Sequence, residues 1–165
     1  MQQIVPHLWF DKEAKEAAAF YASMFKDSKV NSVSTITDTP SGDCDIVSFT
    51  LAGQDFMSIS AGPVFKFNPS ISFFTMFDGE AEIDAVWQKL VEGGEVLMPY
   101  QAWPWAKKYG WLQDKYGVSW QIVPTVLGKM MQYKDAQKVE RVTKALFQMK
   151  KLDIEALKRA FEGTT

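Results

Sequence analysis

The chain has 165 residues, of which 47% are hydrophobic and 23% charged, so it is long enough for one domain and too apolar for a disordered segment. Eighteen Lys and Arg residues against 20 Asp and Glu residues give a formal net charge of −2. This balance lacks the basic excess that a nucleic-acid or anionic-membrane partner requires. We therefore expect neither partner.

The single cysteine and the single histidine limit which disulfides, metal sites and catalytic triads the chain can form. Cys44 alone cannot form an intramolecular disulfide or a zinc site of several thiolates, which is typical of a reducing compartment. The N-terminal segment reaches charged residues before any long apolar run, unlike a signal peptide or a membrane span. These features favour a cytoplasmic location. Any triad or metal site that needs histidine would have to use His7.

A strand followed by a helix opens the chain. Residues 4–10 are apolar and aromatic, as expected of a strand, and residues 12–25 consist largely of strong helix formers. Asp11 between them is a candidate N-cap, and the helix is predicted to end near Lys26. Its apolar stripe comprises Ala14, Ala17 or Ala18, Tyr21 and Phe25.

The same order of elements then occurs twice. Alternating apolar and polar residues predict three strands over residues 30–38, 44–53 and 54–61. After turn residues, the chain restarts with a strand over 70–77, a helix over 80–94 that Gly93 and Gly94 close, and short strands over 95–100, 108–114 and 118–124.

Matching positions support an internal duplication. The offset is 65 residues from His7 to Ser72 and from Trp9 to Phe74, and 64 residues from Gly53 to Gly117 and from Met57 to Gln121. The sequence therefore predicts an α+β domain over residues 1–124, built from two tandem βαβββ modules over about 1–62 and 70–124.

The composition changes after residue 124. Residues 125–165 carry a formal charge of +4, whereas residues 1–124 carry −6. Two apolar stripes at helical spacing predict a C-terminal helical extension of two amphipathic helices. The stripes are Val139, Val142, Leu146 and Met149, followed by Ile154, Leu157 and Phe161. A docked, solvated helix pair explains them better than a membrane or RNA contact, because acidic residues are interspersed.

Aromatic residues are dense between residues 100 and 111. The set is Tyr100, Trp103, Trp105, Tyr109 and Trp111, and Pro104 predicts that this stretch is a loop. Such side chains could close a pocket over an apolar or cationic small molecule, or they could plug the core or a subunit interface. We assign Trp103 and Trp105 to the pocket and Trp111 to the core.

Several segments carry a family resemblance. PHLWFDKEAKEAAAFYASMF (6–25), DKYGVSWQIVP (114–124), KALFQMKKLDIEALKRAF (144–161) and the duplicated module together resemble the PhnB-like branch of the vicinal oxygen chelate superfamily. This superfamily includes glyoxalases, bleomycin-resistance proteins and dioxygenases. Members of the branch are often labelled 3-demethylubiquinone-9 3-methyltransferase-like. The label finds little support in the residues, because none of the ten glycines forms a G-x-G motif.

The resemblance implies that the modules form a mixed eight-stranded open cup. In metal-dependent members, His or Glu ligands lie on the first and last strand of each module, at positions that correspond here to His7, Met57, Ser72 and Gln121. Only His7 is an ordinary ligand for a first-row metal. We therefore predict no bound metal and no cofactor. Asp114 matches an acidic turn of the family, although capping of that turn explains it as well.

The sequence thus predicts a small-molecule-binding protein with an aromatic-lined pocket and a degenerate metal site. The predicted ligand contacts are His7, Trp9, Met57, Ser72, Phe74, Trp103, Trp105 and Gln121. The alternative is an enzyme, a lyase, dioxygenase or transferase, that uses His7 with a metal or in acid–base chemistry. A histidine on a strand can also be merely hydrogen-bonded in the core. Uncovered sheet edges and the C-terminal stripes predict a homodimer.

Overall fold

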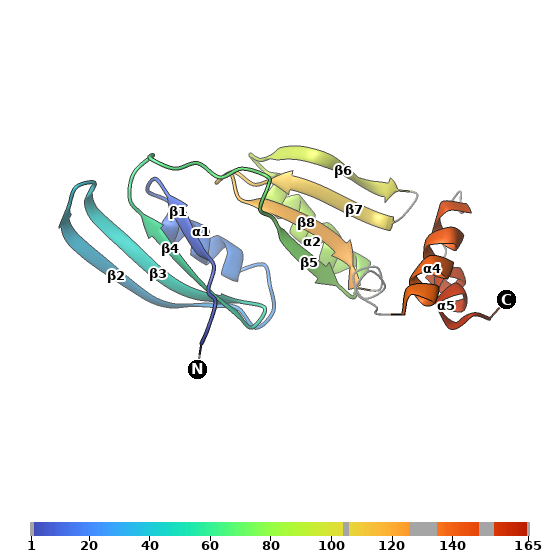
Figure 1. Ribbon diagram of the computed structural model, residues 1–165. Coiled ribbons are helices and arrows are strands. Elements are labelled where there is room, and N and C mark those ends of the chain that lie inside the picture. The colour runs from blue at the N-terminus through green and yellow to red at the C-terminus, as the bar shows by residue number, and fades with distance from the viewer. Residues whose placement is uncertain (1, 104–105, 126–134, 149–153, 165) are drawn as a thin grey trace. The chain divides into compact units, whose positions relative to one another are not determined.

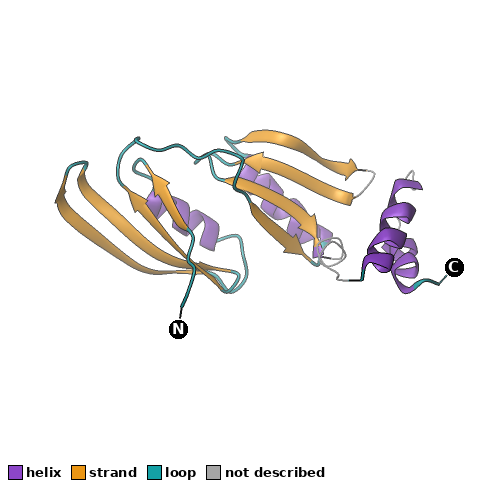
Figure 2. Ribbon diagram, in the orientation of Figure 1, coloured by secondary structure: helices purple, strands orange, loops and turns teal. Residues whose placement is uncertain are grey.

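The computed structural model describes the chain except for residues 1, 104–105, 126–134, 149–153 and 165, together with the side chains of a few neighbouring residues (Figure 1). The chain divides into two compact units, Met1–Asn68 and Pro69–Thr165. Each unit contains one mixed four-stranded sheet with a helix along one face (Figure 2).

The first unit is a βαβββ module. Its elements are β1 (His7–Phe10), α1 (Ala14–Ala22), β2 (Lys29–Thr39), β3 (Gly42–Leu51) and β4 (Gln54–Ser60). The strand order is β1-β4-β3-β2, in which β1 and β4 are parallel and the other neighbours antiparallel. One face of α1 is buried against the sheet, as the apolar stripe predicts. The buried helix residues are Ala14, Ala17, Ala18 and Tyr21.

The beginning of α1 corrects the sequence prediction. Asp11 is not the N-cap, because the helix begins later, after Glu13, whose side chain makes no capping hydrogen bond. The amide of Ala14 instead donates to Ser60 Oγ on β4, at 3.0 Å. A residue 46 positions away thus satisfies an N–H group that helix starts leave without an intrahelical partner. The helix also ends earlier than Lys26.

The second unit repeats the module. Its elements are β5 (Phe73–Phe77), α2 (Glu80–Val91), β6 (Glu95–Trp103), β7 (Ala106–Gln113) and β8 (Ser119–Pro124). The strand order is β5-β8-β7-β6, again with the first and last strands parallel. The α+β class with two similar modules is therefore confirmed, with the eight strands divided between two sheets.

The aromatic stretch is a hairpin, and the prediction of a loop is wrong. Strand β6 continues to Trp103 and β7 begins at Ala106, with Tyr109 opposite Gln101 in the antiparallel register. Pro104, on which the expectation of a loop rested, lies outside the described residues. Three register shifts interrupt the β6–β7 ladder. Trp105 lies outside the described residues, as does the side chain of Trp103.

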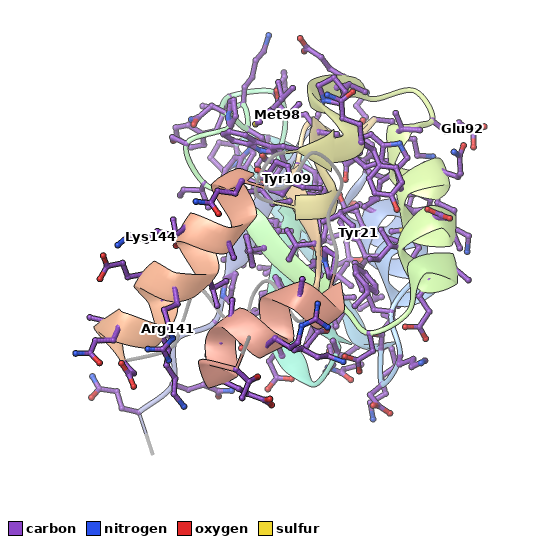
Figure 3. All side chains as sticks on the ribbon, turned by 90° about the vertical axis from the view of Figure 1, so that its right-hand side faces the viewer. Tyr21, Glu92, Met98, Tyr109, Arg141 and Lys144 are labelled. Carbon is purple, nitrogen blue, oxygen red and sulfur yellow. The ribbon has the colours of Figure 1, made fainter. Side chains whose placement is uncertain are left out.

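Two helices, α4 (Ala136–Gln148) and α5 (Ile154–Glu162), pack against each other near the C-terminus. Asp135 Oδ1 caps α4 by accepting from the amides of Gln137 and Lys138. Arg141 on α4 (Figure 3) donates to the carbonyl oxygens of Ala160 and Phe161 at 3.0 and 3.1 Å, so it binds the C-terminal end of α5. Among the described residues, no helix is both long and apolar enough to cross a membrane.

Gly110 on β7 allows α2 to pack closely on the second sheet. A Cβ atom at this position would lie 2.2 Å from Cζ3 of Trp87, a buried residue of α2. The Trp87 ring also stacks on Tyr100, with centroids 4.9 Å apart, and the Tyr100 hydroxyl donates to Asp84 Oδ1 at 2.6 Å. Tyr100 therefore belongs to the packing of α2.

We expect Gly110→Ala to destabilise the protein by about 1–3 kcal/mol, because the added methyl group must displace a buried indole ring. Denaturant unfolding measures the loss. Gly79→Ala is the matched control, since a Cβ there would meet no atom closer than 3.9 Å, and it should cost at most ~1 kcal/mol as a helix-cap change. Equal midpoints for the two variants would contradict the packing described.

Candidate functional site

Each sheet has a distal face, meaning the face turned away from its helix. Side chains alternate between the two faces of a strand, so the register fixes which residues share the distal face. In the first sheet His7 lies opposite Met57, Met57 opposite Ser48, and Ser48 opposite Ser32. This row crosses all four strands. His7 is exposed and Met57 is 37% exposed, so the interpretation of His7 as a core residue is wrong.

Trp9 lies two residues along β1 from His7 on the same distal face. Its Nε1 donates to the carbonyl oxygen of Gly62 at 2.8 Å, and its ring meets Phe65 edge-on with centroids 5.0 Å apart. These contacts hold a partly buried indole ring beside the row that contains His7.

A second distal row crosses the second sheet. Phe74 lies opposite Gln121, Gln121 opposite Trp111, and Trp111 opposite Met98. Met98 and Trp111 pack against a buried cluster of Tyr109 and Val123, while Phe74 is 40% exposed. Figure 3 labels Met98 and Tyr109. The row is thus apolar and aromatic, with Gln121 as its polar member.

Hydrogen bonds fix the polar groups of this face. The Tyr109 hydroxyl donates to Gln121 Oε1 at 3.0 Å, and Gln121 Nε2 donates to Ser72 Oγ at 2.7 Å. Trp111 Nε1 donates to Ser119 Oγ at 2.8 Å. Burial raises the pKa of Tyr109 above its ordinary value, so its hydroxyl remains protonated and able to donate at neutral pH.

Asp114 organises the turn that leads into β8. Its Oδ1 accepts from the amides of Tyr116 and Val118 at 2.9 and 3.0 Å, and its Oδ2 accepts from Trp120 Nε1 at 2.9 Å. The side chain is buried, and these three bonds compensate for the loss of water. Asp114 therefore caps the turn, which fixes the start of the strand that carries Gln121.

The structure brings together several of the predicted ligand contacts within each module. His7 and Met57 are direct neighbours in the first module, with Trp9 beside them, and Ser72 and Gln121 are hydrogen-bonded in the second. Trp103 and Trp105 cannot be placed, because their side chains lie outside the described residues. Sequence reasoning missed the role of Tyr109, which its position two residues before Trp111 on one strand could have indicated.

The family's metal-ligand positions carry a donor set that suits a divalent first-row metal poorly. They supply one imidazole, one thioether, one hydroxyl and one amide, with no carboxylate. Two of these groups, Gln121 and Ser72, bind each other. In the part of the chain that the structure describes, no three His, Cys, Asp or Glu side chains cluster so as to hold a metal ion.

Two βαβββ modules, each with a mixed four-stranded sheet and one helix, define the glyoxalase-like fold of the vicinal oxygen chelate superfamily. A family model described as 3-demethylubiquinone-9 3-methyltransferase matches residues 2–123. The chain belongs to this family, the PhnB-like branch of the superfamily. The match ends before the helices α4 and α5.

Solved structures agree with this assignment. A PhnB protein from Bacillus cereus is 40% identical, with a TM-score of 0.69 over 74% of this chain and 99% of its own. A protein from Pseudomonas aeruginosa is 25% identical, with a TM-score of 0.64 over 75% and 98%. A fosfomycin resistance protein from Listeria monocytogenes shares the fold at 10% identity, with a TM-score of 0.53 over 74% and 91%. No curated protein matches the chain.

Replacing Asp114 with alanine should lower the free energy of unfolding by about 2–4 kcal/mol, because three donors lose their acceptor and two of them are buried. Asp114→Asn should cost less, since its amide oxygen can still accept from the two backbone amides. Thermal and denaturant unfolding test this order. An Asp114→Ala variant as stable as the parent chain would refute the capping role.

Proposed function

We propose that the protein binds a small organic molecule with a planar apolar part, chiefly on the distal face of the second sheet. The observation that carries this proposal is the row Phe74–Gln121–Trp111–Met98, in which aromatic and thioether side chains flank one amide. Small-molecule sites combine largely apolar walls with a few fixed polar groups. A ligand that covers the exposed part of Phe74 would also be stabilised by burial of apolar surface, by ~25 cal/mol per Å².

The first module offers a second set of predicted contacts. Trp9 is held by its bond to Gly62 and by Phe65, and the exposed His7 and Met57 lie beside it. An indole ring with fixed orientation can stack on a planar ligand at low entropic cost. On this basis we propose His7, Trp9 and Met57 as ligand contacts on the distal face of the first sheet, considered separately from the second.

We further propose that this binding needs no metal. Ser72 and Gln121 occupy two of the family's ligand positions with neutral groups that satisfy each other by hydrogen bonding. A divalent ion would have to break that bond and would gain only weak donors. The enzyme alternative depends on His7, whose exposed imidazole remains accessible to a substrate.

A homodimer and a cytoplasmic location complete the proposal. Strand β2 is an edge of the first sheet and is exposed along almost all of its eleven residues, with Val33 and Ile36 46% and 48% exposed. A long edge of this kind usually pairs or is covered. The sole cysteine, Cys44, is buried and free, which suits a reducing compartment.

The adjacent residues Phe73 and Phe74 provide a matched test of the binding face. Phe74 lies on the distal face, whereas Phe73 packs on Trp120 with ring centroids 5.1 Å apart. We expect Phe74→Ala to weaken binding of acetophenone and α-methylstyrene about three- to tenfold, with little loss of stability. Phe73→Ala should lower stability by about 2–4 kcal/mol and leave both affinities nearly unchanged.

NMR titration that follows the indole N–H of Trp111 measures both affinities. If neither probe binds at millimolar concentration, or if Phe74→Ala binds both as well as the parent chain, the proposed face is not the binding site.

Elemental analysis separates the metal-free binder from the enzyme alternative. Protein purified from metal-replete cells should carry far less than one equivalent of zinc, nickel, iron or manganese, and a chelator should leave its melting temperature unchanged. Stoichiometric metal that is lost on His7→Ala would refute the metal-free proposal and favour the enzyme.

A further inference from the structure

The hydrogen bonds on the distal face of the second sheet share one direction. Tyr109 donates to the oxygen of the Gln121 amide, and the nitrogen of the same amide donates to Ser72 Oγ. An amide has its acceptor and its donor on opposite atoms, so it transmits the direction of the first bond to the second. The chain of hydrogen bonds therefore runs from the Tyr109 hydroxyl, through the Gln121 amide, to the Ser72 hydroxyl.

The first and last residues of this chain of hydrogen bonds differ in their exposure to solvent. Tyr109, which begins it, is only 6% exposed, whereas Ser72 is partly exposed and precedes β5. Gln121 is the hydrogen-bond partner of the Ser72 side chain among the described residues, and toward Gln121 the serine oxygen acts as acceptor. The hydroxyl proton of Ser72 is therefore available to a third group. Aligned hydrogen bonds polarise one another, which makes that terminal hydroxyl a better donor.

We infer that Tyr109, Gln121 and Ser72 form a directed hydrogen-bond chain that presents the Ser72 proton to an oxygen acceptor of the ligand. This inference rests on the proposed function and adds the class of ligand, a carbonyl group attached to a planar apolar ring. The ring would cover Phe74 and the carbonyl oxygen would accept from Ser72, two residues earlier. A neutral carbonyl suits this row better than a carboxylate, because none of its four members is charged and an unpaired charge is costly to desolvate.

Acetophenone and α-methylstyrene test this inference, because they are nearly isosteric and only acetophenone has a carbonyl acceptor. The parent chain should bind acetophenone about three- to tenfold more tightly, the factor that one net hydrogen bond supplies. Ser72→Ala should abolish this preference by weakening acetophenone binding alone. Ser23→Ala is the matched control: this exposed serine follows α1 and donates to the Phe20 carbonyl, so the preference should persist.

Two further variants test the direction of the hydrogen bonds between Tyr109, Gln121 and Ser72. In Gln121→Glu, a carboxylate would accept from both hydroxyl groups, so the Ser72 proton would turn toward residue 121 and the preference should disappear. In Tyr109→Phe, the amide loses its fixed donor, and the preference should fall without vanishing. Circular dichroism and melting temperature show whether each variant is folded.

Each outcome has a distinct meaning. Equal binding of both probes to the parent chain would overturn the directed chain and leave the proposed binding face intact. A preference that survives Ser72→Ala or Gln121→Glu would also overturn it, because the carbonyl would then be recognised elsewhere. Binding of neither probe to the parent chain would overturn both proposals.

Discussion

In each module the last strand returns to lie parallel to the first, and this pairing places residues from opposite ends of the module in one row. Parallel neighbours cannot be joined by a tight turn, so the helix and two further strands fill the connection. His7 thereby meets Met57, and Phe74 meets Gln121. These two pairings therefore bring together four of the candidate ligand contacts.

The two modules keep one topology but present different chemistry. The distal row of the first sheet contains an imidazole, a thioether and two serine hydroxyls, whereas that of the second contains two aromatic rings, a thioether and one amide. The two modules are similar frames that carry different side chains. The fold alone therefore does not specify the ligand, and the side chains of each row must be read separately.

The sequence was sufficient for the fold because helical spacing, strand alternation and turn residues are local signals. The buried stripe of α1 and both strand–helix–strand orders follow from them. The errors arose where distant residues decide the outcome. The α1 cap comes from Ser60, and β6 and β7 extend further than the proline suggests because they pair with each other as far as Trp103 and Ala106. The candidate site was predicted as separate positions, while the bond from Tyr109 to Gln121 required the register.

The contact between Gly110 and Trp87 also limits how this family can vary in sequence. The Trp87 ring occupies the space that a side chain at position 110 would fill, so the sizes of the residues at positions 87 and 110 depend on each other. A larger residue at position 110 fits only with a smaller one at position 87; enlarging position 110 first creates a clash, and shrinking position 87 first leaves a cavity. The pair should therefore change together during evolution, as a single coupled unit that joins α2 to the sheet.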